Sequence, residues 1–220
     1  MTSALNDKVI VIAGATSASG RAVARALVDA GARVIAVGSH QGRLDELEVD
    51  IPGVTGERAD LTDGDDVLEL AMRVHAKVGD VDGVVHLVGG WRGGGGIPGQ
   101  TEEDYRVLER SFTALRNASR VFWDDLVASD AGRVAIVSST TVEKPTAGGA
   151  NYTSIKAASE SWMRSLADGF AKAGAPGAAV TFRVKALDGL EARLADEVVA
   201  LWAADAAASD LNGRVTTLAK

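Results

Sequence analysis

Three residues of the chain, a serine, a tyrosine and a lysine, have the types and spacing that proton transfer requires. Tyr152 and Lys156 are four residues apart in a stretch that predicts a helix, so their side chains share one helix face. An unperturbed tyrosine has a pKa of about 10, and an ammonium group within about 4–6 Å stabilises the phenolate and lowers that pKa. Tyr152 could then exchange a proton with a carbonyl or hydroxyl oxygen, which Ser139 would hold by a hydrogen bond. A chance tyrosine–lysine pair on a helix is the alternative.

A glycine-rich loop near the N-terminus has the composition of a phosphate-binding turn. It reads Ala13-Gly14-Ala15-Thr16-Ser17-Ala18-Ser19-Gly20 and leads into a predicted helix. Gly14 permits a tight turn, and Gly20 lets the helix pack closely against the preceding strand. The helix N-terminus would present N–H groups and a positive dipole end to a pyrophosphate. Ala18 stands where a central glycine is usual, and a plain strand–turn–helix joint is the alternative.

Short runs rich in Val and Ile alternate with longer amphipathic stretches along the whole chain. The predicted strands lie at 8–14, 33–37, 54–60, 81–89, 133–139, 178–185 and 213–218. The predicted helices lie at 21–31, 41–48, 65–77, 101–128, 152–173 and 190–204. The early strands are apolar on both faces, which predicts an α/β fold: a single doubly wound parallel sheet of about seven strands with helices on both faces. We expect one domain over residues 1–220, with ligands at the carboxyl ends of the strands.

The composition excludes several classes of function. The 220 residues carry 23 basic and 30 acidic side chains, a net charge of −7, which argues against nucleic acid as a partner. No apolar run approaches the ~20 residues that span a bilayer, and the N-terminus MTSALNDKVIVIAGA does not resemble a secretion signal. The lack of cysteine excludes disulfides and thiolate metal sites, and three scattered histidines argue against an imidazole-based metal site. We therefore expect a cytoplasmic protein that acts on a small molecule, without a bound metal and away from membranes.

Together these motifs, in this order, resemble the short-chain dehydrogenase/reductase family over almost the whole chain. Ser139 and Tyr152-Thr153-Ser154-Ile155-Lys156 match the family's active site, and the glycine-rich loop matches its cofactor loop. The resemblance implies a Rossmann-type fold, a nicotinamide cofactor that exchanges a hydride, Tyr152 as proton donor, and Lys156 also on the nicotinamide ribose. It implies as cofactor-binding residues Gly14, Thr16, Ala18, Ser19, Gly20, Asp60, Leu61, Gly89, Gly90 and Lys156. Because family members associate through two long helices, it also implies a homodimer or homotetramer.

The chain departs from the family pattern at several positions. Ser111 stands at the position of a catalytic asparagine that helps to hold a water in the family's proton relay. His86 replaces another asparagine, and we expect it to be a buried, hydrogen-bonded residue rather than a catalytic one. The family's Pro-Gly after the sixth strand is missing, and the segment that covers the substrate there is much shortened. We therefore expect an open substrate pocket.

One subgroup of the family, quinoid dihydropteridine reductase, resembles the chain at some of these unusual positions. It shares Ala18, Ser111 and the run Gly89-Gly90-Trp91, but it lacks a serine at the position of Ser139. A flat pterin could stack on Trp91. A loop aromatic that covers the edge of the core is the alternative for this tryptophan.

The end of the second predicted strand bears on the choice of cofactor. An acidic residue there would bind the adenosine ribose and repel a 2′-phosphate. This chain has Gly38-Ser39-His40 instead, with Arg43 close behind. We therefore predict that Ser39 and His40 bind the cofactor and that NADP is preferred over NAD. A solvated helix residue is the alternative for Arg43.

Three functions follow as hypotheses from the sequence. Ser139 favours a small carbonyl or alcohol oxidoreductase, and the Gly89-Gly90-Trp91 run favours a pterin reductase. Ser111 and the shortened cover favour a third, a nucleotide-binding regulator or scaffold with little turnover.

Overall fold

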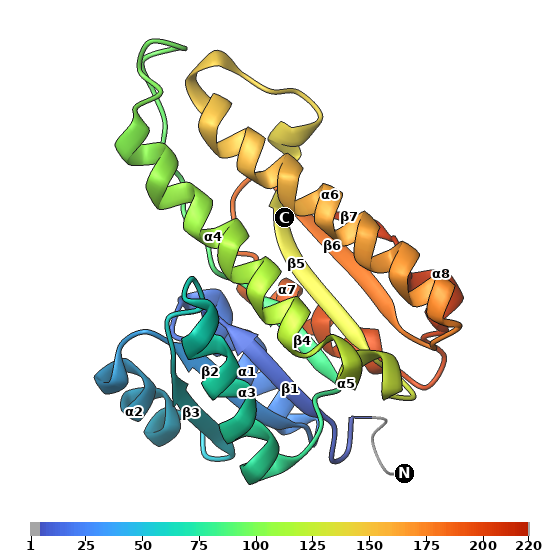
Figure 1. Cartoon of the computed structure of the whole chain (residues 1–220). Coiled ribbons are helices and arrows are strands. Elements are labelled where there is room, and N and C mark those ends of the chain that lie inside the picture. The colour runs from blue at the N-terminus through green and yellow to red at the C-terminus, as the bar shows by residue number, and fades with distance from the viewer. Residues whose placement is uncertain (1–4, 220) are drawn as a thin grey trace.

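The computed structural model describes residues 5–219 as a parallel sheet between two layers of helices (Figure 1). The sheet order is β3-β2-β1-β4-β5-β6-β7, and each neighbouring pair is parallel. The strands are β1 (Val9–Ala13), β2 (Arg33–Gly38), β3 (Val54–Arg58), β4 (Gly83–His86), β5 (Arg133–Ser139), β6 (Ala178–Val184) and β7 (Val215–Leu218). This is the predicted doubly wound fold of Rossmann type, with seven strands.

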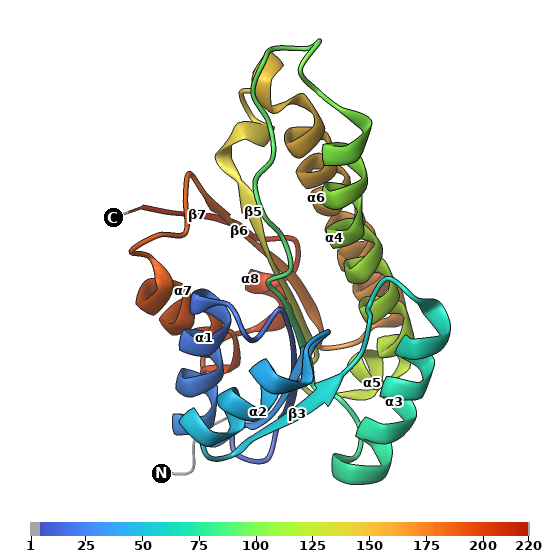
Figure 2. The ribbon, with the colours of Figure 1, turned by 90° about the vertical axis from the view of Figure 1, so that its left-hand side faces the viewer.

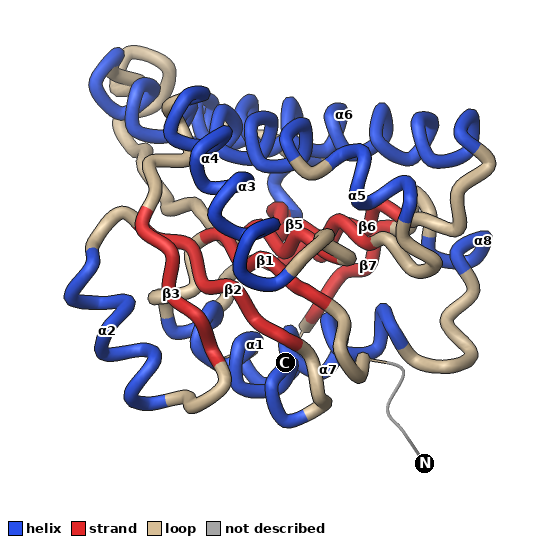
Figure 3. The backbone as a smooth tube through the Cα atoms, turned by 60° about the horizontal axis from the view of Figure 1, so that its bottom comes forward, coloured by secondary structure: helices blue, strands red, loops and turns tan. Residues whose placement is uncertain are grey.

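Helices cover both faces of this sheet (Figure 3). They are α1 (Ala18–Asp29), α2 (Gln41–Asp50), α3 (Gly64–Val78), α4 (Glu102–Val121), α5 (Trp123–Ala128), α6 (Ala150–Ala173), α7 (Glu191–Val199) and the short α8 (Ala208–Leu211). Helices α1, α2 and α7 lie on one face, and α3, α4, α5 and α6 lie on the other. The two longest helices, α4 and α6, pack side by side (Figures 1 and 2).

The central strand shows why the sheet is covered on both sides. In β1, Ile10 and Ile12 point into the core on the α1 side, while Val9, Val11 and Ala13 point into the core on the α4 side. All five side chains are buried, so neither face of this strand can meet water. Because the strands are parallel, the carboxyl ends of β1, β2, β4 and β5 lie at one edge of the sheet, where the connecting loops form the site.

Helix boundaries differ from the sequence prediction at two places that affect the site or the core. Helix α1 begins at Ala18 rather than at residue 21, because the Ser17 hydroxyl accepts a hydrogen bond from the Gly20 N–H and caps the helix. The helix expected over 101–128 is broken at Phe122, a fully buried residue whose backbone leaves helical geometry. The chain after it continues as the separate helix α5.

The structure bears on one of two expectations, that the N-terminus is not a secretion signal and that no segment spans a bilayer. Residues 1–4, which begin the polar N-terminus, lie outside the described residues. Among the helices of residues 5–219, none combines the length and the apolar composition needed to cross a bilayer.

Candidate active site

The structure brings the three predicted catalytic residues together in one pocket. Ser139 is the last residue of β5, while Tyr152 and Lys156 lie one turn apart near the start of α6. All three line a cavity of about 490 Å³, here called the substrate pocket. Its wall also holds Trp91, Val184 at the end of β6, and residues 185–188 of the short connection between β6 and α7. A cavity of this size suits a small-molecule ligand.

Tyr152 is held in its protonated form by its surroundings. Burial raises the pKa of its hydroxyl, and a hydrogen bond from Ser139 offsets part of that rise. The sequence predicted a lowered pKa because of Lys156, and this is wrong for the structure described. The Lys156 ammonium lies 5.8 Å from the centre of the tyrosine ring and donates to the Val137 carbonyl oxygen at 2.9 Å. A protonated tyrosine is the form that can donate a proton to a substrate.

Lys156 is partly buried, one helical turn after the tyrosine. Burial lowers the pKa of its ammonium to about 8, and the negative charge of Glu160 acts in the opposite direction. Glu160 itself is paired with Arg183 through two hydrogen bonds, of 2.9 and 2.7 Å. Lys156 therefore remains mostly charged at neutral pH.

A second hollow, here called the nucleotide pocket, lies at the carboxyl ends of β1, β2 and β3. Six predicted cofactor-binding residues line it: Gly14, Thr16, Ser39, His40, Asp60 and Leu61. Arg43 lines it as well, so the side chains at the end of β2 all face one space. Val88 lines both this pocket and the substrate pocket, which makes the two hollows neighbours.

The glycine-rich loop depends on its glycines for close backbone contacts. Gly14 has a φ of +83°, and a Cβ there would lie 3.0 Å from the backbone of Leu87 and Val88. A Cβ on Gly20 would collide with the Gly14 carbonyl oxygen. Ala18, Ser19 and Gly20 form the first turn of α1, and Ser17, which the sequence analysis missed, caps it. The serine was recognisable as one of the residue types preferred at helix N-caps.

Asp60 is fixed by neighbours that the sequence analysis did not identify. The Thr62 backbone N–H and hydroxyl both donate to its carboxylate, at 2.9 and 2.7 Å. Arg110 from α4 donates to the same carboxylate at 3.0 Å. These bonds, with those from Thr62 the largest cause, lower the pKa of Asp60. Asp60 is therefore ionised at neutral pH and held in place at the wall of the nucleotide pocket.

Hydrogen bonds from Gln100 hold the glycine-rich loop after β4, residues 89–96. The Gln100 side-chain amide donates to the carbonyl oxygens of Gly94, Gly96 and Gly148, at 3.0, 3.1 and 3.1 Å. Its carbonyl oxygen accepts from the Asn151 N–H at 3.0 Å. The loop thus runs beside the start of α6 (Figure 2). Its Trp91 side chain is 62% exposed at the mouth of the substrate pocket.

Ser111 lines a further hollow beside Gly89, Gly90 and Trp91, and His86 is the last residue of β4. The Ser111 hydroxyl donates to the Leu108 carbonyl within its own helix, at 2.7 Å. His86 is buried and hydrogen-bonds to the Ser111 backbone, but its Nδ1 has no partner among the described residues. The expectation of a fully hydrogen-bonded histidine is therefore wrong for this atom. Burial, followed by the charge of Lys156, lowers the pKa of His86 to about 3, so the ring is neutral at physiological pH.

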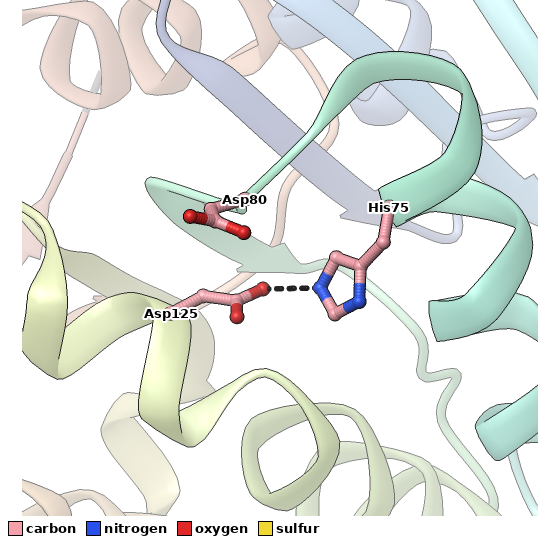
Figure 4. Close-up of side chains that lie close together, drawn as sticks. All are labelled: His75, Asp80 and Asp125. Atoms are coloured by element: carbon pink, nitrogen blue, oxygen red, sulfur yellow. Dashed lines mark hydrogen bonds and ion pairs between the residues drawn. The ribbon is translucent and has the colours of Figure 1, made fainter.

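One of the three histidines, His75, lies close to two carboxylates. His75, Asp80 and Asp125 place their ligand-type atoms within 4.8 Å of one another (Figure 4). The His75 Nε2 lies 2.7 Å from an Asp125 carboxylate oxygen, which also accepts from the Val81 N–H at 3.2 Å. This cluster lies at the amino end of β4, opposite the two pockets. Its bonds join the end of α3 and the start of β4 to α5.

Comparison with known proteins identifies the family. A family model described as short chain dehydrogenase matches residues 8–188. This chain belongs to the short-chain dehydrogenase family of oxidoreductases. The family resemblance predicted from the sequence is thereby confirmed, whereas the dihydropteridine reductase subgroup stays a hypothesis.

Relatives within this family differ in how much of their length this chain covers. The uncharacterized oxidoreductase YvrD of Bacillus subtilis is 28% identical over 167 residues, which cover 74% of this chain and 63% of YvrD. The 3-oxoacyl-(acyl-carrier-protein) reductase FabG of Salmonella typhimurium is 26% identical over 188 residues, 82% of this chain and 77% of FabG. A metagenomic short-chain oxidoreductase, solved in complex with NADP, has a TM-score of 0.85 at 25% identity, covering 99% of this chain and 100% of that one. The chain thus spans less than two thirds of YvrD.

Proposed function

We propose that this short-chain dehydrogenase reduces a small carbonyl compound with a nicotinamide cofactor, with Tyr152 as the proton donor. The observation that carries this proposal is the hydrogen bond between Ser139 and Tyr152 in a pocket that also holds Lys156. The substrate pocket adjoins the nucleotide pocket at Val88, so a ligand in each would meet there. The raised pKa of Tyr152 suits proton donation to a substrate oxygen.

The residues present fit a nicotinamide dinucleotide. Gly14 brings the loop backbone close to Val88, and α1 directs its capped N-terminus toward the same edge of the sheet. A Cβ on Gly89 would lie 3.4 Å from the Lys156 ammonium, so a glycine there leaves space beside that charge. When bound, the cofactor would supply the hydride.

Residues of the chain would bind the substrate oxygen, donate the proton and stabilise the tyrosinate that remains. Ser139 would donate a hydrogen bond to the substrate oxygen, and Tyr152 would transfer its proton to that oxygen as negative charge develops there. Lys156 would stabilise the tyrosinate that remains, because an ammonium nearby favours the ionised form. The same groups acting in reverse would oxidise an alcohol.

We further propose NADP as the preferred cofactor. Ser39, His40 and Arg43 line the nucleotide pocket at the end of β2, where a carboxylate would repel a 2′-phosphate. The metagenomic relative in complex with NADP supports this choice. Arg43→Ala should weaken NADPH binding about ten-fold, or ~1.4 kcal/mol, and leave NADH binding unchanged, as measured by cofactor fluorescence. An equal loss for both cofactors would show that Arg43 does not contact the phosphate.

Reduction of a quinonoid dihydropterin is a second candidate. The exposed Trp91 indole lies at the mouth of the substrate pocket, where a flat bicyclic ring could stack on it. The tryptophan would then act in substrate binding, whereas Tyr152 would keep its role.

A substrate screen with NADPH and with NADH distinguishes these functions. The panel should contain ketones, aldehydes and quinonoid dihydropterin, with Tyr152→Phe as the control protein. Turnover of carbonyl compounds alone supports the main proposal, and turnover of the pterin alone supports the second. Tight cofactor binding with no turnover of any compound would contradict both and favour a regulator.

We also propose a homodimer or homotetramer that associates through α4 and α6. Phe112 and Trp162 lie on these two helices, and both side chains are only partly buried in the single chain. Light scattering should give two or four times the chain mass of 22.7 kDa. Trp162→Glu should shift the protein to a monomer, and a monomeric native protein would contradict the proposal.

A further inference from the structure

A row of hydroxyl groups leads from the buried side of α6 to the reacting centre. The Thr153 hydroxyl donates to the Thr141 hydroxyl at 3.0 Å, and the Thr141 hydroxyl donates to the Ser139 Oγ at 3.0 Å. Ser139 in turn hydrogen-bonds to Tyr152. Thr153 is 6% exposed, so the far end of the row is shielded from water.

The local backbone explains why these groups meet. Ser139 ends β5, and the chain turns at once into a 3-10 helix, Thr140–Val142. The Ser139 Oγ caps that turn by accepting the Thr141 N–H at 3.2 Å. The same turn therefore places the Thr141 hydroxyl beside Ser139 on one side and beside Thr153, in the first turns of α6, on the other.

The hydrogen-bond inventory of a hydroxyl group fixes the direction of the row. A hydroxyl has one proton to donate and two lone pairs with which to accept. The Ser139 Oγ accepts from the Thr141 N–H and from the Thr141 hydroxyl, which uses both lone pairs. Its single proton is then left to point toward Tyr152 or toward a substrate oxygen at the same place.

We propose that Thr141 and Thr153 are positioning residues that hold the Ser139 proton on the reacting oxygen. The inference rests on the proposed function, because the oxygen in question is that of a carbonyl substrate or of Tyr152. Thr141 also lines the substrate pocket, whereas Thr153 does not, and the proposed role of both threonines is exerted through Ser139. Successive hydrogen bonds also polarise one another, so the row strengthens the bond that Ser139 donates.

The first experiment isolates the hydroxyl of Thr141 without changing its shape. Thr141→Val keeps the side-chain volume and the backbone N–H but removes the hydroxyl, while Thr141→Ser restores it. In alcohol oxidation we expect kcat to fall about ten-fold in Thr141→Val. The rising limb of its pH profile should move to higher pH, because a weaker bond from Ser139 leaves the pKa of Tyr152 higher. Thr141→Ser should recover most of the rate, and Thr153→Val should show a smaller loss of the same kind.

Two kinetic outcomes would overturn the inference. An unchanged kcat and pH profile in Thr141→Val would show that Ser139 orients its proton unaided. A loss in Thr141→Ser as large as that in Thr141→Val would show that the methyl group, and therefore packing, matters rather than the hydroxyl.

A second measurement does not depend on turnover. The chain has two tyrosines, so Tyr105→Phe leaves Tyr152 as the only one. In that background, the ¹³C resonance of the Tyr152 Cζ atom reports the hydrogen bond to its oxygen at neutral pH. We expect it to move in Thr141→Val and to return in Thr141→Ser. An unchanged resonance in Thr141→Val would contradict the proposed action of Thr141 on Tyr152 through Ser139. If the resonance shifts but no compound in the substrate screen is turned over, only the proposed function is contradicted.

Discussion

The nucleotide pocket and the substrate pocket are built by different means. The first rests on backbone: a tight turn at Gly14, a close helix contact at Gly20 and the start of α1. The second rests on side chains that reach it from β5, α6, the loop after β4 and the connection after β6. Spacing within a few residues sets the glycine-rich loop of the first, although its wall also takes residues from the ends of β2 and β3 and from α4. The second requires that distant segments be brought together. We therefore expect changes in the first to affect the whole fold and changes in the second to affect specificity.

The largest effect is expected at Gly20, where a side chain would meet backbone. Because a Cβ there would collide with the Gly14 carbonyl oxygen, Gly20→Val should lower the free energy of unfolding by about 3 kcal/mol and abolish tight cofactor binding. Chemical denaturation and cofactor fluorescence measure the two effects. Gly42→Ala, in α2 with nothing within 4 Å of its added Cβ, is the matched control and should be neutral or stabilising. Wild-type stability and binding in Gly20→Val would contradict the backbone origin of this pocket.

His86, the buried last residue of β4, should make the fold sensitive to acid. Its pKa is about 3 in the folded protein and about 6.5 when unfolded, so below pH 6.5 the unfolded chain binds the extra proton. The native state should therefore lose about 2 kcal/mol through this residue between pH 8 and pH 5. Urea unfolding of the wild type and of His86→Asn at both pH values isolates the contribution. Equal losses in the two proteins would show that His86 is not buried in its neutral form.

The smallest effect is expected at Gln100, which only holds a loop of the substrate pocket. Gln100→Ala removes the bonds to Gly94, Gly96 and Gly148, so the loop that carries Trp91 should become less ordered. We expect KM for the carbonyl substrate to rise about five-fold, or ~1 kcal/mol, with cofactor affinity and unfolding free energy little changed. Gln100→Glu keeps the acceptor for Asn151 but loses the donors, and it should resemble Gln100→Ala. A loss of cofactor affinity of the same size would show that the two pockets are not separable in this way.

The same contrast explains what the sequence could predict. The sheet was predictable because the residues of β1 are apolar on both faces of the strand. The glycine-rich loop was predictable because its glycines are only a few residues apart in the sequence. The raised pKa of Tyr152 was not predictable, since it depends on burial of the hydroxyl and on Lys156 donating its hydrogen bond to the Val137 carbonyl instead. The contact between Thr141 and Thr153 depends on how the 3-10 helix after β5 packs against α6, and this packing cannot be predicted from the spacing of apolar residues. The break at Phe122 was not predictable either, because phenylalanine is not a helix-breaking residue type.

The proton donated by Tyr152 is the central claim, and one pair of measurements on Tyr152→Phe tests it. The substitution removes only the hydroxyl, so NADPH affinity, measured by fluorescence, should stay within about two-fold of the wild type. Turnover of the carbonyl substrate found in the screen should fall by about 10²–10⁴-fold, the range expected for loss of a general acid. Turnover within a few-fold of the wild type, with cofactor binding intact, would contradict this role of Tyr152.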